Sequence, residues 1–171
     1  RGLGDVYKRQ NINNGDTKLA IKSNPSTARF SPNGEYAFGY NQIDSTWFTY
    51  NVKTSKYIEL TKGKVFYDEL NDSPDYPRSY GFAGWTEKDN RLLIYDRYDI
   101  WEFNPDDGSS RRLTKGRETK TIFRYVKLDS EKTFIEDLKF KHRLLTHTDK
   151  LDRFHKQQNV TPNNRLIFRL K

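Results

Sequence analysis

The sequence predicts an all-β protein made of short antiparallel strands. Three short apolar or alternating runs, at 92–95, 100–103 and 111–113, are separated by turn clusters at 88–90 and 104–108. This order of runs and turns is typical of a strand meander. Phe, Trp and Tyr make up 15% of the residues, and many of them alternate with polar residues. Such alternation is expected of strands that bury one face and expose the other.

The composition fits one folded domain. The 171 residues are enough for an ordinary domain with a core. The chain is 33% hydrophobic and 32% charged, with a mean hydropathy of −1.02. Disordered chains have similar values, but the aromatic content favours a folded one. No run approaches the length of a membrane span, so we expect no membrane partner. No secretory signal opens the chain, and because the sequence contains no Met we interpret it as an internal fragment of a longer protein. The absence of Cys excludes disulfides and thiolate metal sites.

The formal net charge of +8 is concentrated in the carboxy-terminal part of the chain. From Arg111 onward there are 17 Lys and Arg against 7 Asp and Glu, or +10; the first 110 residues carry 14 against 16, or −2. A basic segment can bind polyanions. Here the charges are interspersed along predicted strands without an arginine-rich run, which favours a solvated sheet face. We do not expect nucleic acid as a partner.

The first ten residues differ in kind from the rest. Residues 1–10 resemble translated sequencing-adapter read-through, and we interpret them as a non-native leader outside the fold. Val6 and Tyr7 are still able to pair as a strand. The native domain is expected to span 11–171.

Three segments carry the same hairpin pattern. Each begins with Asn, passes through a polar turn and ends at Leu: residues 11–19, 51–60 and 104–113. Asn, Asp, Gly and Ser favour turns because they bond the local backbone or accept positive φ. The pattern predicts three copies of one β-hairpin.

A longer repeat contains two of these hairpins. It is visible in four pairs of similar residues: Phe30 and Trp85, Tyr40 and Tyr95, Asn51 and Asn104, Thr61 and Thr114. The first two pairs are 55 positions apart (85 minus 30), and the last two are 53 apart (104 minus 51). The difference predicts a two-residue length change in the loop between the second and third strands. Self-similarity with length variation in turns is typical of a repeat architecture.

A third, less regular unit follows. Residues 121–128 are predicted to form a strand and 129–132 a turn, with further strands at 143–147, 151–155 and 165–170. Four short antiparallel strands per unit match the blade of a β-propeller, whose ring closes with about four to eight blades.

The predicted fold is therefore a partial β-propeller, an open arc of about three four-stranded antiparallel blades. The blades are expected at about residues 26–63, 82–116 and 121–171. Trp85 and Trp101 lie in the apolar register of their strands and are predicted to pack between blades. The acids of the Asp96–Asp99 segment are expected to accept hydrogen bonds from the backbone amides of a turn.

An acidic and aromatic insertion, residues 64–81, separates the two regular units. Two prolines interrupt it, so we expect a surface loop with one short helical turn at 67–71. Long loops on a rigid repeat scaffold often carry the binding site.

Four runs, at 66–77, 80–89, 95–101 and 124–129, resemble the amino-terminal β-propeller of bacterial prolyl oligopeptidase family serine peptidases. The resemblance implies that the chain is a fragment of a substrate-gating propeller. In the parent protein this propeller would be joined to a carboxy-terminal α/β-hydrolase domain with a Ser-Asp-His triad. The resemblance also implies a peptide substrate, because the propeller covers the active site and limits access to it. An exported or periplasmic location follows from the same resemblance.

The chain itself lacks the chemistry of a serine hydrolase. No Gly-x-Ser-x-Gly nucleophile elbow occurs, so we predict no catalytic residue and an inactive chain. The three histidines, His142, His147 and His155, all lie in the third unit. His142 and His147 would point to opposite faces of one strand. We therefore predict no metal site and no cofactor.

Asp68 and Glu69 are the candidate substrate-contact residues. In dipeptidyl-peptidase members of the family, acidic residues on a propeller insertion hold the free amino terminus of the substrate. The resemblance loosely extends this role to Asp68 and Glu69. Carboxylates suit it because they accept charge-assisted hydrogen bonds from an ammonium group. The structural alternative is that either residue caps a turn or pairs with Arg78.

A second function is also compatible with the sequence. A propeller can be a stand-alone interaction module that binds proteins or polyanions through its loops and its basic face.

Overall fold

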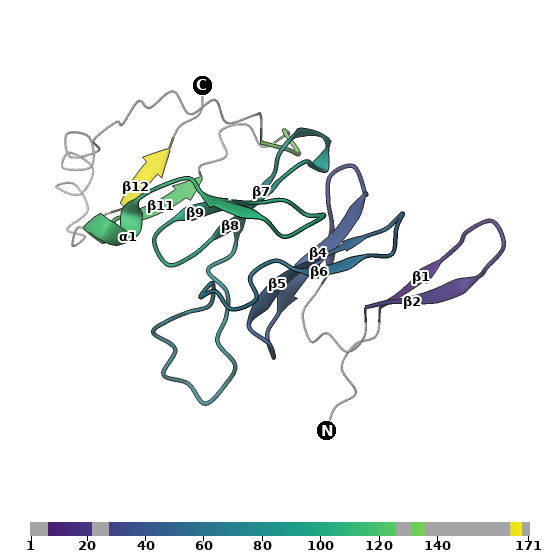
Figure 1. Ribbon diagram of the computed structural model, residues 1–171, viewed down its shortest axis with the longest axis horizontal. Helices are drawn as coiled ribbons and strands as arrows, with labels where there is room; N and C mark the ends of the chain where they lie inside the picture. The colour runs from purple at the N-terminus through teal and green to yellow at the C-terminus, as the bar shows by residue number, and fades with distance from the viewer. Residues whose placement is uncertain (1–6, 22–27, 126–130, 136–164, 169–171) are drawn as a thin grey trace.

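The described part of the chain is almost entirely β-structure, as predicted. The computed structural model describes residues 7–21, 28–125, 131–135 and 165–168. Within these residues the helical segments are the single turns η1 (Glu87–Asp89) and α1 (Gly116–Thr119), and neither is long and apolar enough to cross a membrane. Two four-stranded antiparallel sheets form the centre of the structure (Figure 1).

The first sheet corresponds to the predicted unit at 26–63. Its strands, in pairing order, are β3 (Arg29–Phe30), β4 (Tyr36–Asn41), β5 (Thr46–Asn51) and β6 (Tyr57–Glu59). The turn between β3 and β4 contains Gly34, which has a φ of +73° and donates its N–H to the Ser31 carbonyl at 2.9 Å. A positive φ favours Gly because it has no Cβ. The Asn-Gly pair in the sequence therefore marks this turn correctly.

The second sheet corresponds to the predicted unit at 82–116 and has the same antiparallel order. Its strands are β7 (Phe82–Trp85), β8 (Leu92–Tyr95), β9 (Ile100–Phe103) and β10 (Ser110–Arg112). All residues of β8 are buried, which explains why this run is apolar without alternation. The structure thus confirms the two regular units as four-stranded antiparallel sheets.

The three predicted hairpin copies share one set of hydrogen bonds. Each copy starts at an equivalent Asn: Asn11, Asn51 or Asn104. The N–H of each Asn donates to the carbonyl five positions later, at 2.8 Å in all three copies. Each Asn Oδ1 accepts the N–H two positions later, at 2.9, 2.9 and 3.1 Å. Because the Asn side chain fixes the turn through local bonds, the sequence pattern is enough to predict it.

The length difference between the two sheets lies in the predicted loop. Tyr40 pairs with Trp47 across the loop of the first sheet, whereas Tyr95 pairs with Ile100 across that of the second. The segment between the paired residues is therefore two residues shorter in the second sheet (40 to 47 against 95 to 100).

The two sheets pack face to face through aromatic side chains. Tyr36 stacks on Trp85 with ring centroids 5.4 Å apart, and Phe38 meets Trp85 edge-on at 5.3 Å. Trp47 meets Phe82 edge-on at 5.7 Å. Such offset and edge-on contacts between buried rings stabilise an interface beyond the burial of area alone. Trp85 therefore packs between sheets, as predicted.

The first sheet is covered on its other face by an amino-terminal hairpin. Phe48 and its buried neighbours pack against Ala20 of β2 (Thr17–Ile21). β2 pairs in antiparallel fashion with β1 (Tyr7–Gln10), which lies within the segment interpreted as a leader. Residues 7–10 of the predicted leader thus form a strand.

The second sheet is covered on its other face by the third unit. Tyr95 and its buried neighbours pack against Phe123 of β11 (Ile122–Tyr125) and against Ile135. Four layers therefore follow one another along the chain: the amino-terminal hairpin, the two sheets and β11 (Figure 1).

The antiparallel pairing predicted for the third unit is wrong for its two described strands. β11 pairs in parallel with β12 (Arg165–Phe168). Parallel neighbours require a long crossover connection, and the chain between residues 125 and 165 is long enough to supply it. The strands predicted at 143–147 and 151–155, and the three histidines, lie outside the described residues.

Candidate functional site

The insertion at 64–81 is fastened to both sheets. Phe66 is buried between the rings of Trp101 and Phe103, with centroid distances of 5.7 and 5.4 Å. On the return path of the insertion, the Tyr40 hydroxyl donates to the Pro77 carbonyl at 3.0 Å. Tyr67 and Ser79 form an antiparallel bridge across the insertion. These contacts hold its acidic residues in fixed positions beside the second sheet.

Asp68 closes a turn instead of a helix. Its Oδ1 accepts the Leu70 N–H at 3.0 Å and the Tyr80 hydroxyl at 3.3 Å. The Asn71 N–H donates to the Asp68 carbonyl, which makes a single hydrogen-bonded turn. The helical turn predicted at 67–71 is therefore wrong, because bridge pairing with residues 78–79 keeps residues 67–68 extended.

Glu69 forms ion pairs with Arg97, in the turn between β8 and β9, and with Arg117, in α1. Its carboxylate accepts a hydrogen bond from Arg117 Nη2 at 2.8 Å and lies 3.6 Å from Arg97 Nη1. The Glu69 N–H donates to the Tyr80 hydroxyl at 2.9 Å, which orients the residue toward the two guanidiniums. The hydrogen bond from Arg117 lowers the pKa of Glu69 below its usual value of about 4.5.

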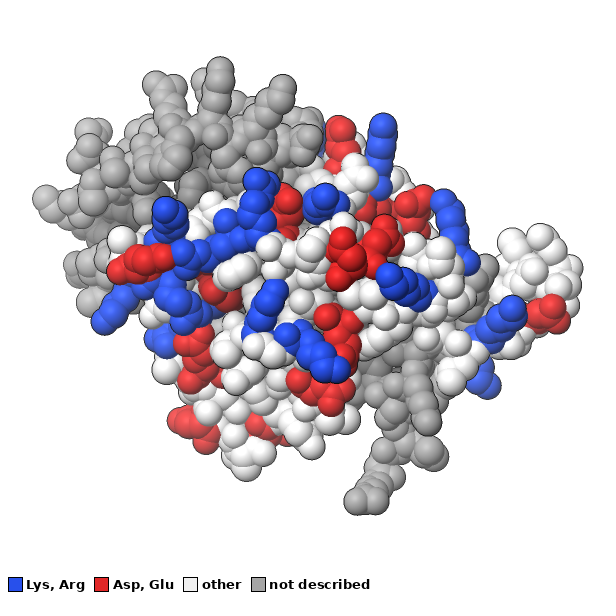
Figure 2. Space-filling model, viewed as in Figure 1, with Lys and Arg blue, Asp and Glu red and all other residues white. Residues whose placement is uncertain are grey.

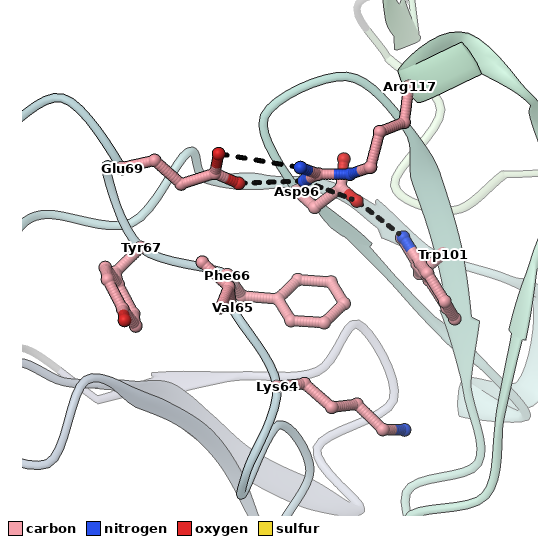
Figure 3. Close-up of a pocket in the computed structure, with 8 residues that line it drawn as sticks. All are labelled: Lys64, Val65, Phe66, Tyr67, Glu69, Asp96, Trp101 and Arg117. Carbon is pink, nitrogen blue, oxygen red and sulfur yellow. Dashed lines mark hydrogen bonds and ion pairs between the residues drawn. The ribbon is translucent and has the colours of Figure 1, made fainter.

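Asp96 holds Arg117 from the opposite side. Its Oδ2 accepts hydrogen bonds from Arg117 Nη2 at 3.4 Å and from Trp101 Nε1 at 3.1 Å. Its Oδ1 accepts the backbone N–H groups of Tyr98 and Asp99. Figure 3 shows the guanidinium of Arg117 between the two carboxylates. These negative charges raise the pKa of Arg117, so this guanidinium stays protonated.

Asp99 fixes the backbone that carries Arg117. It is fully buried and accepts hydrogen bonds from Thr114 Oγ1 and the Gly116 N–H at 2.5 Å, and from the Arg117 N–H at 3.1 Å. A buried carboxylate needs several donors to offset its desolvation. Asp96 and Asp99 thus both satisfy turn amides, as predicted, and together they position Arg117.

Tyr98 supports both arginines. The guanidinium carbons of Arg97 and Arg117 lie 5.1 and 5.3 Å from the centre of its ring. A cation within about 6 Å of an aromatic face is attracted to it. The two side chains therefore share one platform on the second sheet.

A pocket of about 540 Å³ lies next to this ion pair. Its lining residues are Lys64, Val65, Phe66, Tyr67, Glu69, Asp96, Trp101 and Arg117. Figure 3 shows the Phe66 ring facing Trp101 below the Glu69–Arg117 pair, with Lys64 on the far side of that ring. Lys64 Nζ donates to Ser110 Oγ at 2.6 Å. The pocket combines an aromatic wall with a charged rim, which suits a ligand that has one apolar and one charged part.

No protein-family model, curated protein or solved structure matches this chain. The ligand class is therefore inferred from the geometry and chemistry of the residues of this chain.

The sequence pattern identifies Glu69 but misses its partners. Arg117 lies 48 positions away and comes from a different structural unit, so no local pattern joins the two. The repeat does contain a signal: Lys64 and Arg117 each follow a Thr-Lys-Gly triplet. Both cations of the pocket thus occupy one position of the repeat. Trp101 packs against Phe66, as expected of a packing residue, and also donates to Asp96.

The described residues contain no group of three or more His, Cys, Asp or Glu side chains arranged to hold a metal ion. The acids of the pocket instead bind arginines and backbone amides. The charged side chains of the pocket are therefore suited to bind a charged group of a ligand.

Proposed function

We propose that this chain is part of the substrate-gating β-propeller of a prolyl oligopeptidase family serine peptidase and is inactive by itself. The observation that carries the proposal is the tandem pair of four-stranded antiparallel sheets packed face to face. Propeller blades pack in this way around a ring. The equivalent hairpins at Asn51 and Asn104 mark the two sheets as copies of one unit.

The layers on either side support an arc of blades. Ala20 packs against the outer face of the first sheet, and Phe123 packs against that of the second. In the proposed arc the amino-terminal hairpin belongs to a preceding blade and β11 to a following one. About three blades would lie in this chain, with others needed to close the ring.

The insertion at 64–81 would face the peptide substrate. It projects from the connection between the two sheets (Figure 1), and its backbone is tied down by Phe66 and Pro77. Asp68 and Glu69 stay the proposed substrate contacts. Because Glu69 is paired with Arg117 and Asp68 bonds its own turn, an arriving ammonium group would have to compete with these partners.

The catalytic groups would come from another domain of the parent protein. The chain has no Gly-x-Ser-x-Gly elbow, so the nucleophile, its base and the oxyanion hole would be supplied by a carboxy-terminal α/β-hydrolase domain. An exported or periplasmic location belongs to the same proposal.

The described residues on the face seen in Figure 2 give less support to a polyanion-binding module. On the face seen in Figure 2, acidic and basic side chains are interspersed among the described residues, without a broad area of one sign. Binding to polyanions usually requires such an area.

Extending the coding sequence at its 3′ end tests the proposal directly. We expect an α/β-hydrolase domain with Gly-x-Ser-x-Gly followed by Asp and His. Further propeller blades followed by a stop codon would instead identify a stand-alone module.

Kinetics of the full-length enzyme test the substrate contacts. Replacing Asp68 and Glu69 with Ala should raise KM for dipeptide-releasing substrates with little change in kcat. The matched control is Ala at Asp72 and Asp75, two exposed acids on the same insertion. An unchanged KM in the Asp68/Glu69 variant would remove these residues from the site.

A further inference from the structure

We propose that Arg97 and Arg117 form a binding site for the carboxylate of an external ligand, and that Glu69 occupies this site in the structure. The expected ligand carries an aromatic or aliphatic group next to a free carboxylate, as the last residue of a peptide does. This inference does not rest on the peptidase assignment, because every group it uses lies in this chain.

The three charged residues come from three separate segments. Arg97 lies in the turn between β8 and β9, Arg117 lies in α1, and Glu69 arrives from the insertion. The carboxylate of Glu69 is within 2.8 Å of one guanidinium and 3.6 Å of the other. Convergence of two guanidiniums on one carboxylate is the geometry by which proteins recognise carboxylate ligands.

Residues other than Glu69 also hold the arginines in place. Asp96 binds the Arg117 side chain at 3.4 Å, and Asp99 binds the Arg117 backbone at 3.1 Å. Tyr98 supports both guanidiniums through its ring. All three supporting residues lie in the turn between β8 and β9. Removal of Glu69 should therefore leave the arginine pair pre-organised.

The charge balance favours an anion once Glu69 has left. Arg97 and Arg117 contribute two positive charges, whereas Asp96 contributes one negative charge. With Glu69 in place the four groups sum to zero; without it they sum to +1. An external carboxylate would restore neutrality and replace the lost charge-assisted hydrogen bonds.

The adjacent pocket accounts for the apolar part of the ligand. Val65, Phe66 and Trp101 line it next to Glu69 and Arg117. Arg117 belongs both to the ion pair and to the pocket lining, so one ligand can bond the guanidinium and contact the aromatic wall. A volume of about 540 Å³ accommodates an amino-acid side chain.

Solvent reaches the ion pair, so exchange with an external carboxylate is possible. The side chain of Glu69 is 22% exposed and that of Arg117 is 42% exposed. Partly exposed pairs of this kind are weak. The next residue, Leu70, is exposed as well.

The test measures binding of two small probes to the 171-residue chain. N-acetyl-L-phenylalanine carries the carboxylate, and N-acetyl-L-phenylalaninamide is the same molecule without the charge. Calorimetric titration of Glu69→Ala should show the acid binding about tenfold more tightly than to the unmodified chain. The amide should show no such gain in affinity. Adding Arg117→Gln to the Glu69→Ala variant should abolish the gain for the acid. Asp72→Ala, which removes an exposed acid from the same insertion, should match the unmodified chain.

Glu69→Gln is the second variant, because it removes the charge but keeps the size of the side chain and a hydrogen-bonding group. Near-ultraviolet circular dichroism measures whether each variant keeps its aromatic packing. If the Ala variant loses this packing, the binding of the two probes is compared in the Gln variant instead. Equal affinity of acid and amide would overturn the proposal. The proposal would also be overturned if neither Glu69→Ala nor Glu69→Gln increased the affinity of the chain for the acid. Neither result would bear on the peptidase proposal, which depends on a different domain.

Discussion

The carboxylate of Asp89 accepts a buried hydrogen bond of 2.5 Å from the hydroxyl of Ser31. Asp89 lies in η1 of the second sheet, and Ser31 lies in the first turn of the first sheet. The same carboxylate accepts the N–H of Asn33 at 3.1 Å and is 1% exposed. One buried acid therefore joins the equivalent first turns of two successive sheets and fixes how they pack.

Asp89→Asn should destabilise the chain by about 2 kcal/mol, because hydrogen bonds to a buried charged group contribute roughly 1.5–3 kcal/mol. An amide oxygen in the place of Oδ2 can still accept from Ser31 and Asn33, but the amide nitrogen would replace Oδ1, which lies 3.3 Å from the same Asn33 nitrogen. Urea unfolding followed by tryptophan fluorescence measures the change. Asp72→Asn, on the exposed part of the insertion, is the control and should leave the midpoint unchanged. A change below about 0.5 kcal/mol for Asp89→Asn would show that this contact does not hold the sheets together.

Two threonines of β5 should respond in opposite ways to replacement by Val. Thr49 Oγ1 donates to the Pro105 carbonyl of the second sheet at 2.8 Å and is fully buried. Thr46 Oγ1 is buried with no hydrogen-bond partner among the described residues. Thr49→Val should therefore cost about 1–3 kcal/mol, whereas Thr46→Val should be neutral or stabilising. Thermal unfolding of the two variants measures both changes in stability. Equal losses of stability would contradict the different hydrogen bonding of the two hydroxyl groups.

The two Thr-Lys-Gly triplets end in glycines with different roles. A Cβ on Gly116 would lie 2.1 Å from the Thr121 carbonyl oxygen and 2.6 Å from the Phe123 ring. Gly63 has a φ of +72° and nothing within 4 Å of such an atom. Asn tolerates that conformation, so Gly63→Asn should be nearly neutral. Gly116→Asn should cost about 3 kcal/mol through overpacking. Denaturant unfolding midpoints measure the stability of the two variants. Similar midpoints would mean that α1 shifts to accommodate the Asn side chain at position 116 with little loss of stability.

The features that the sequence predicts well are those fixed by neighbours in the chain. Each hairpin turn depends on an Asn that bonds its own backbone, so Asn11, Asn51 and Asn104 reveal the turns without any knowledge of the sheets. The apolar run in β8 likewise reports that both faces of this strand are buried.

The features that the sequence misses depend on distant contacts. Nothing near Glu69 indicates that Arg117 will meet it, because their approach follows from the packing of the insertion on the second sheet. The tendency of 67–71 to form a helical turn is overridden by the bridge between Tyr67 and Ser79. The parallel pairing of β11 with β12 is equally invisible to a pattern of local alternation.

Alkaline pH should destabilise the chain through tyrosines that the fold shields from water. Burial, with a smaller contribution from the hydrogen bond to Asp106, raises the pKa of Tyr36 to about 12, and partial burial raises that of Tyr57, which is 39% exposed, to about 12. In the unfolded chain these phenols ionise near pH 10, so above pH 10 the unfolded state loses protons that the folded state keeps. Stability should therefore fall as the pH rises from 10 to 12. Tyr36→Phe should make this fall less steep; an unchanged slope would show that Tyr36 is not protected in the fold.

Acid should weaken the contact between Glu69 and Arg117. The hydrogen bond from Arg117 lowers the pKa of Glu69 in the folded chain below its usual value of about 4.5. The stabilisation is therefore fully present above pH 4.5 and is lost as the pH falls through the lower pKa of the folded state. Because the pair is partly exposed, it should contribute less than about 1 kcal/mol. Carbon-detected NMR of the Glu69 carboxyl group should give a midpoint below 4.5, and Arg117→Gln should move that midpoint upward. A midpoint that is the same in both proteins would mean that Arg117 does not hold Glu69 in solution, and the insertion would then be free of this anchor.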